Sequence, residues 1–263
     1  MKGLSKYFNK RHDFLLKLLH KQSCSRKHIH KVRVEIKKFN SLFELIKFCF
    51  VDFKKKEIYK PYKEIFLQAG KVRDIQLEEE TLKKYSVTDS LKKYRKKLKE
   101  SRLIEQALFI SVAEKKMRLL NDYDKVVPYF SAVNAKRIHR YINKKINQLT
   151  AFQFKQVLET AEIHAFRKNL KELIYNMESL GLKPGSWISD NNNILELLGK
   201  WHDSQVIIHH LNESLVSSIT SSEDKIELEK LIVILSADNI DLLKQVKRSI
   251  QSVEFDNSKI NQL

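Results

Sequence analysis

Two short motifs each occur twice in this sequence, in the same order and at nearly the same separation. The first motif, H-x2-R-x3-K, spans residues 30–37 and 164–171, and the second, G-K-x2-D-x-Q, spans residues 70–76 and 199–205. The copies are 134 and 129 residues apart, so one small insertion or deletion reconciles them. This arrangement indicates a tandem duplication of a helical unit. We predict a single domain over residues 1–263, made of a first helical unit, residues 1–125, and a second, residues 131–263.

Apolar residues recur at spacings of three and four along most of the chain, which is the period of an amphipathic helix. Clear stripes run over residues 32–46, 138–149 and 166–177. Helix breakers at Pro61, Gly70 and Pro128, and in the turn that starts at Gly181, are expected to separate the helices. Signals for strands are scarce. The chain is therefore predicted to be all-α, with about ten helices in two tandem bundles.

The whole surplus of positive charge lies in the first part of the chain. There are 50 Lys and Arg against 32 Asp and Glu, a net charge of +18; residues 1–150 have a balance of +22 and residues 151–263 one of −4. A hydrophobic content of 42% is enough to build a core, which excludes a disordered basic tail. The small numbers of glycines and prolines argue against Gly-rich nucleotide loops and turn-rich β folds. Such a charge predicts an anionic partner, whether nucleic acid, a phosphate polymer or a membrane surface.

No segment of the sequence resembles a signal peptide or a membrane span. The first 21 residues read as an amphipathic helix interrupted by lysine and arginine, and the most apolar stretches, residues 48–51 and 231–235, are too short to cross a bilayer. Cys24 and Cys49 show no metal-binding spacing, so we expect two ordinary thiols. We therefore expect a soluble, cytoplasmic protein.

Each copy of the first motif places three basic side chains on one face of a helix, because residues at i, i+3 and i+7 are neighbours there. Arginine offers a fork for phosphate oxygens, lysine a point charge, and histidine a donor that gains charge beside an anion. The recurrence of the same order favours an anion site over a merely solvated face. The residues are His30, Arg33 and Lys37 in the first unit, with Arg26 extending the stripe by one turn, and His164, Arg167 and Lys171 in the second.

Two further helix faces are basic, and each alone is typical of a solvated polar surface. Together with the first stripe, they account for much of the positive charge. The run Lys54–Lys56 is interpreted as an exposed helix start or loop. The two faces carry Lys92, Arg95, Lys96 and Lys99, and Lys136, Arg137, Arg140 and Lys144.

Signs of an enzyme are weak. Asp74 and Asp203 recur, but a lone carboxylate near a helix start more often caps the helix or orients a neighbouring cation. The carboxylates of Glu78–Glu80 are consecutive, so they diverge around a helix and do not converge on a metal ion. No Walker loop, GxSxG, HExxH or zinc spacing occurs. We expect no catalytic residue, no metal and no cofactor, and we expect Trp187 and Trp201 to be packing residues.

The order of the motifs resembles that of the conserved histidine α-helical domain (CHAD) family. The resemblance rests on H-x2-R-V-x2-K-K at His30, on Arg73-Asp74, on the second H-x2-R-x3-K segment with Tyr175 after it, and on L-G-x3-D ending at Asp203. It covers essentially the whole chain. It implies two helical bundles related by a pseudo-twofold axis, with a basic cavity or groove between them. It also implies binding of inorganic polyphosphate, with granule components and polyphosphate-metabolising enzymes as further partners.

By position, the resemblance implies that one set of residues lines the polyanion site. The sequence departs from the family at Asn40, Glu172 and Ile174, where basic residues are common, and at His202, where glutamine is common. Together with the balance of −4, these departures favour a smaller contribution from the second unit. The implied residues are His30, Arg33, Lys37, Lys38, His164, Arg167 and Lys171, to which we add Arg73 beside Asp74, and Lys168.

The function predicted from the sequence is binding of inorganic polyphosphate without catalysis, with successive phosphates held by charge-assisted hydrogen bonds. Nucleic acid is an alternative, but single-strand binders interleave aromatic and basic residues, whereas the aromatics here lie on apolar faces. A second alternative is a polyphosphate or triphosphate hydrolase that depends on Asp74 or Asp203. A third is a scaffold whose acidic second unit binds another protein.

Overall fold

The computed structural model describes residues 2–85, 87, 90–182, 188, 191–216 and 221–255. In these residues the chain forms nine α-helices and one 3-10 helix, and a single bridge between Ile188 and Phe255 is the only extended pairing. The all-α prediction is confirmed. The helices are α1 (Lys2–His20), α2 (Arg26–Cys49), α3 (Lys55–Lys84), α4 (Lys92–Met117), the 3-10 helix η1 (Arg118–Lys125), α5 (Val127–Ala132), α6 (Ala135–Gln153), α7 (Thr160–Ser179), α8 (Asn191–Val216) and α9 (Ser222–Ser252).

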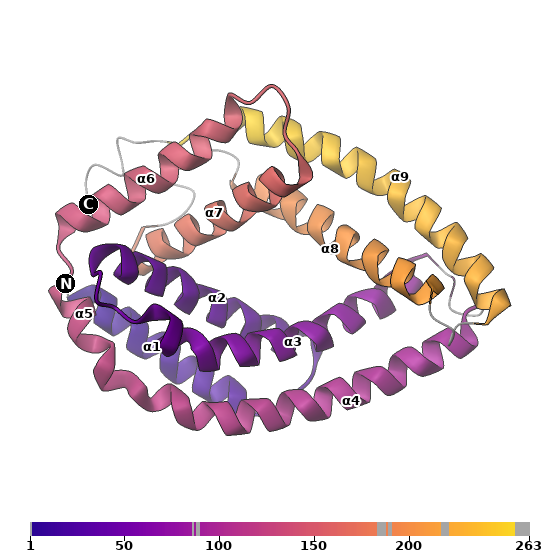
Figure 1. The fold of residues 1–263 in the computed structure, drawn as a ribbon, viewed down its shortest axis with the longest axis horizontal. Coiled ribbons are helices and arrows are strands. Elements are labelled where there is room, and N and C mark those ends of the chain that lie inside the picture. Colours follow the sequence, from indigo (N-terminus) through magenta and orange to yellow (C-terminus); the bar gives the residue numbers. More distant parts are fainter. Residues whose placement is uncertain are drawn as a thin grey trace.

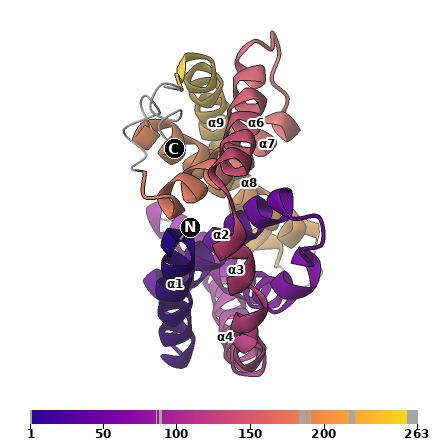
Figure 2. The same ribbon diagram turned by 90° about the vertical axis from the view of Figure 1, so that its left-hand side faces the viewer.

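The helices form two sets that meet through α2 and α7 (Figures 1 and 2). Helices α1–α4 lie on one side and α6–α9 on the other, with η1 and α5 between them in sequence. α3 packs along α4, and α8 packs along α9; α4 and α9 form outer edges of the molecule in Figure 1. The first motif thus falls on α2 and α7, and the second on α3 and α8. The duplication itself stays a prediction from the sequence.

The hydrophobic core is continuous across the predicted boundary between the two units. Its larger cluster runs from Leu4 in α1 to Val253 after α9 and includes the fully buried Phe39, Phe166 and Trp201. A second cluster joins α3 and α4 to α8 and α9. Both clusters draw on both units, so the helices that carry the motifs are fixed against each other by shared packing. The packing role of Trp201 is confirmed, while Trp187 lies outside the described residues.

Two of the predicted helix breakers do not break a helix. Pro61 and Gly70 both lie inside α3, so this part of the sequence-based prediction is wrong. Pro61 removes one helical hydrogen bond, and the burial of Tyr62 and Ile65 directly after it holds the helix in place. Gly70 costs the helix about 1 kcal/mol relative to alanine, and its lack of a side chain has a specific use described below. Gly181, in contrast, ends α7 in the left-handed conformation, with a φ of 85°.

Two further expectations hold in the part of the chain that the structure describes. Cys24 and Cys49 are both free thiols. No helix there combines the length and the apolar character needed to cross a membrane. Lysine and arginine recur in most of the long helices, although α8 has Lys200 alone, and they keep one face of those helices polar.

Candidate anion-binding site

The two H-x2-R-x3-K motifs lie on the two helices through which the halves of the molecule meet. α2 begins after Ser25, and α7 begins with a capping box between Glu159 and Glu162 that satisfies its first backbone amides. From these starts, the helical period turns the apolar residues of each motif into the core and its basic residues to the opposite face. With Arg73 of α3, these basic residues form what we call the central cluster. Its members are His30, Arg33, Lys37, Arg73, His164, Arg167 and Lys171.

Lys37 on α2 and Lys171 on α7 lie close enough to repel each other. Burial, aided by Lys171, Arg33 and Arg167, lowers the pKa of Lys37 to about 7. Burial and Arg167 lower the pKa of Lys171 to about 8. In the described part of the chain, neither ammonium group has a hydrogen-bond or ion-pair partner. The centre of the cluster is therefore short of negative charge.

Arg33 is held in place by α3. Its Nη1 donates a hydrogen bond of 3.1 Å to the carbonyl oxygen of Phe66, and its guanidinium carbon lies 4.3 Å from the centre of the Phe66 ring. A Cβ atom on Gly70 would lie 2.4 Å from the same Nη1. Gly70 is thus needed for the close approach of α3 to Arg33. The equivalent Gly199 has no neighbouring atom within 4 Å of such a Cβ, so the two glycines differ in role.

Asp74 and Asp203 supply negative charge to the cluster without neutralising it. Both carboxylates act to raise the pKa values of Arg33 and Arg73, and Asp203 also acts on Lys37, Arg167 and Lys171. Among the described residues, neither lies within ion-pair distance of these five cations. Two carboxylates therefore face five cationic groups. The described residues also contain no group of three or more potential metal ligands.

Three polar atoms at the site are buried without a hydrogen-bond partner in the described chain. They are Nε of Arg167, Nη1 of Arg73 and Nδ1 of His202. The Arg73 atom lies 3.9 Å from a carboxylate oxygen of Glu80, which is too long for a hydrogen bond. Buried polar atoms are nearly always paired in proteins. Unpaired donors on Arg167 and Arg73, beside unpaired lysines, fit a site that is completed by an anion with several oxygen atoms.

The histidines of the site are neutral near pH 7. Burial, with Arg167 and His164, lowers the pKa of His202 to about 3. Burial also lowers the pKa values of His164 and His30, with Arg167 and Arg73, respectively, acting in the same direction. The His164 ring lies 4.5 Å from Trp201 and 5.4 Å from His202, edge to face in the latter case. The imidazoles thus offer hydrogen bonds and not charge. The sequence shows His202 only as a departure in the second G-K-x2-D-x-Q motif, and its place beside His164 depends on the packing of α7 against α8.

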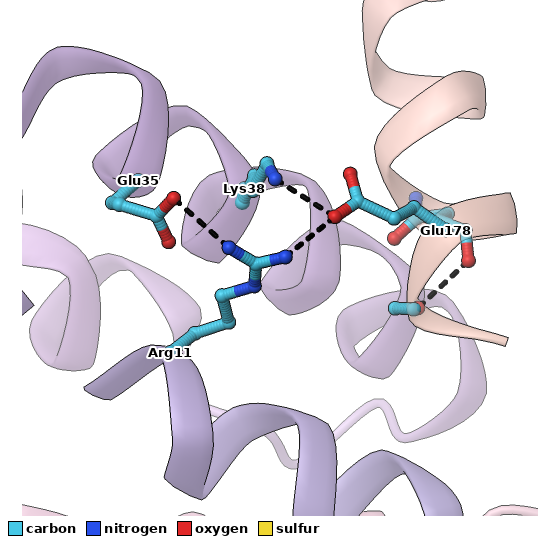
Figure 3. A network of polar contacts seen from close by, with 6 residues as sticks. Arg11, Glu35, Lys38 and Glu178 are labelled. Carbon is cyan, nitrogen blue, oxygen red and sulfur yellow. Dashed lines mark hydrogen bonds and ion pairs between the residues drawn. The ribbon is translucent and has the colours of Figure 1, made fainter. Parts of the chain in front are cut away.

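Lys38 does not belong to the central cluster, contrary to the role that the family resemblance implies. Figure 3 shows it in a network with Arg11, Glu35 and Glu178. Its ammonium lies 2.8 Å from Glu178, and Arg11 lies 2.7 Å from the same carboxylate and 3.2 Å from Glu35. The network ties α1 and α2 to the end of α7. The charge of Lys38 is thereby neutralised within the protein.

The remaining predicted residues surround the cluster or lie away from it. Arg26 is ion-paired with Glu80, close to Arg73, and marks one edge of the cluster. Lys168 is exposed on α7. The others lie on the exposed faces of the outer helices α4 and α6 (Figure 1), so they do not line the space between α2 and α7. These residues are Lys92, Arg95 and Lys96 on α4, and Lys136, Arg137, Arg140 and Lys144 on α6.

The departures from the family pattern in the second unit leave the cluster intact. Glu172 is buried toward α6, where it accepts a hydrogen bond from the hydroxyl of Tyr141 and lies 2.8 Å from Lys145. Ile174 is part of the hydrophobic core. Glu172 lies off the face that carries Arg167 and Lys171, whereas Ile174, at i+7 and i+3 from them, borders that face and adds no charge to it. The acidic balance of the second unit therefore does not reduce its share of cations at the centre.

A family model described as the CHAD domain matches residues 15–212, which is most of the chain. The chain belongs to the CHAD family. The match includes α2 and α7 and both copies of both motifs. The crystal structure of the CHAD domain from the plant Ricinus communis has a similar fold, with a TM-score of 0.68 at 15% identity, covering 95% of this chain and 92% of that chain. No similar protein was found among the curated proteins. The resemblance inferred from the motifs is confirmed.

Proposed function

We propose that this CHAD domain binds inorganic polyphosphate in the central cluster and does not catalyse a reaction on it. The observation that carries the proposal is the set of half-buried, unpaired cations that α2 and α7 direct at one another: Lys37, Lys171 and Arg167. A chain of phosphates supplies repeated negative charges and many acceptor oxygens, which is what such a cluster lacks. The family's association with polyphosphate supports the same ligand.

Each kind of side chain has a distinct part in the proposed complex. Arg33 and Arg167 give forked hydrogen bonds to phosphoryl oxygens, and the unpaired Nε of Arg167 is satisfied. Lys37 and Lys171 act as point charges whose partial burial strengthens their attraction to the ligand. An anion between them also raises both of their pKa values, so binding above about pH 7 is accompanied by proton uptake. In the free protein, the negative charge of Asp203 partly offsets the repulsion among these cations.

The experiment that tests the proposal is a titration with polyphosphates of graded length at two salt concentrations. Affinity should fall steeply with salt, by analogy with phosphate backbones, because condensed counterions are released on binding. Single-stranded nucleic acid added at equal total phosphate should fail to displace a long polyphosphate. Displacement by nucleic acid, or binding that is independent of salt, would contradict the proposal.

A hydrolase is the second candidate function, and it has less support. Asp74 and Asp203 lie near enough to act on each other, but both stand among cations, and the described residues gather no group of three or more potential metal ligands. Release of orthophosphate with Mg²⁺ or Mn²⁺, abolished by Asp74→Asn or Asp203→Asn, would establish this function. We also propose that the protein acts in the cytoplasm, in contact with polyphosphate granules or with enzymes that make or consume the polymer.

Gly70→Ala is expected to weaken polyphosphate binding about tenfold while the protein stays folded. The new Cβ displaces the Arg33 guanidinium from the carbonyl of Phe66, and the mobile end of Arg33 yields more easily than the backbone. Gly199→Ala is the matched control, because it removes the equivalent glycine where there is open space. It should leave affinity unchanged and stabilise α8 by about 0.5–1 kcal/mol. Equal affinities of the two variants, measured by calorimetry, would show that the position of Arg33 is unimportant.

A further inference from the structure

A second basic hollow lies at the turn between α2 and α3. It has a volume of about 760 Å³, and its lining comes from the second half of α2, the connection and the first three turns of α3. The lining contains six lysines and no carboxylate. Its apolar floor includes Phe53, which is buried, and the ring of Tyr59. We call it the lysine groove, after its polar residues Asn40, Lys47, Lys54, Lys55, Lys56, Lys60 and Lys63.

Most of the lysine groove's charge is not used within the protein. Lys55 is ion-paired with Glu44, and Lys47 donates a hydrogen bond of 2.6 Å to the carbonyl of Val51. In the described chain, the ammonium groups of the other four lysines have neither a hydrogen bond nor an ion pair, and all four side chains are exposed. The start of α3, at Lys55, adds the positive end of a 30-residue helix to the same place. Lysines from three consecutive stretches thus converge on one hollow.

The lysine groove is continuous with the central cluster along both helices. On α2, Asn40 follows Lys37 by one turn, and on α3, Lys63 precedes Phe66 by one turn. Phe66 is the residue on which Arg33 and Lys37 rest, at 4.3 Å and 5.7 Å from its ring centre. At 1.5 Å per residue, the path along α2 from Arg33 to Lys47 is about 21 Å long. This is a track suited to an extended polymer and too long for a single compact phosphate group.

We infer that a long polyphosphate chain held in the central cluster continues along α2 and α3 into the lysine groove. This inference rests on the proposed function and adds a direction and a site size to it. The cluster then supplies a short, strong site, and the lysine groove adds affinity only for chains long enough to reach it. Asn40 lies at the junction between the two sites, where its side-chain amide can donate to a passing phosphate.

The test compares a short and a long ligand on the same variants. The groove variant carries Lys54→Gln, Lys56→Gln, Lys60→Gln and Lys63→Gln together. The control variant carries Lys6→Gln, Lys10→Gln, Lys17→Gln and Lys21→Gln, which remove the same charge from exposed positions in α1 and in the turn directly after it. The groove variant should bind long-chain polyphosphate roughly ten- to a hundredfold more weakly, with a shallower salt dependence. It should bind tripolyphosphate within about twofold of the parent, because this short ligand does not reach the lysine groove from the central cluster and the charges of exposed lysines are screened by salt.

The outcomes separate this inference from the proposed function. Equal long-chain affinities of the groove and control variants would overturn the inference and leave the central site standing. Failure of the parent to bind either ligand would remove the proposed function and the inference with it. Acetylation of lysines in the parent, followed by mass spectrometry, gives an independent readout. Long-chain polyphosphate should protect Lys60 and Lys63 from acetylation, tripolyphosphate should not, and equal labelling with both ligands would also overturn the inference.

Discussion

Replacing Arg33 and Arg167 together by alanine is expected to reduce polyphosphate affinity by roughly a hundred- to a thousandfold. Loss of one partner from a buried, charged hydrogen-bond pair costs about 2–5 kcal/mol, and each 1.4 kcal/mol is about a tenfold change in affinity. Both side chains are largely buried, and burial lowers the pKa of each. The helical circular-dichroism signal should be unchanged, because neither guanidinium belongs to an ion pair that holds the described helices together.

The control for this variant is the pair Arg95→Ala and Arg140→Ala. These arginines are exposed on the outer helices α4 and α6, and their loss changes the net charge by the same amount. We expect the control pair to change affinity by less than about threefold in calorimetric titrations. If both pairs weaken binding equally, net charge alone attracts the ligand. If the Arg33 and Arg167 variant binds polyphosphate as tightly as the parent, the basic faces of α2 and α7 are merely solvated and do not form the binding site.

Lys37→Met is expected to stabilise the free protein while it weakens binding. A buried cation without a partner is costly, and an apolar side chain of similar length removes that cost. We expect a gain of about 1–2 kcal/mol, which for a domain of this size raises the melting temperature by about 2–6 °C. Polyphosphate affinity should fall at least tenfold in the same variant. Opposite changes in stability and binding distinguish a site residue from a packing residue, whose loss would lower both.

The stabilisation should depend on pH in a definite direction. Burial lowers the pKa of Lys37 from 10.5 to about 7, so its charged form is disfavoured in the folded state. The cost is fully present below about pH 7, and it fades as the pH rises toward the unfolded value. The difference in melting temperature between Lys37→Met and the parent should therefore be larger at about pH 6 than at about pH 9. Lys31→Met, an exposed position on the same helix, should show no such difference. A difference in melting temperature between Lys37→Met and the parent that does not change with pH would contradict the burial of an unpaired charge.

The features of the fold and of the site that can be predicted from the sequence are those set by local periodicity. The spacing of three and four residues predicts the helices and puts His30, Arg33 and Lys37 on one face. The recurrence of H-x2-R-x3-K marks α2 and α7 as the helices to compare. The exposed face that includes Lys96 on α4 is predicted for the same reason. In each case the information lies within one or two helical turns.

The parts that the sequence does not reveal depend on contacts between distant helices. The sequence alone suggests that Gly70 breaks a helix. Its actual role, leaving room for the guanidinium of Arg33, depends on a side chain from another helix. Lys38 follows Lys37 directly, yet it turns to Glu178, which is 140 residues away. The positive charge of the Lys54–Lys56 run is evident from the sequence alone. That these lysines line a hollow is not, because α2 brings Asn40 and Lys47 to the same place only in the folded protein.

The most direct test of the central claim is a crystal structure of the protein with tripolyphosphate. We expect phosphoryl oxygens between α2 and α7, within hydrogen-bond distance of Arg167 Nε and of the Arg33 guanidinium, with the ammonium groups of Lys37 and Lys171 beside them. Phosphate bound only to the lysines and arginines of α4 and α6, with the central cluster unchanged, would contradict this claim.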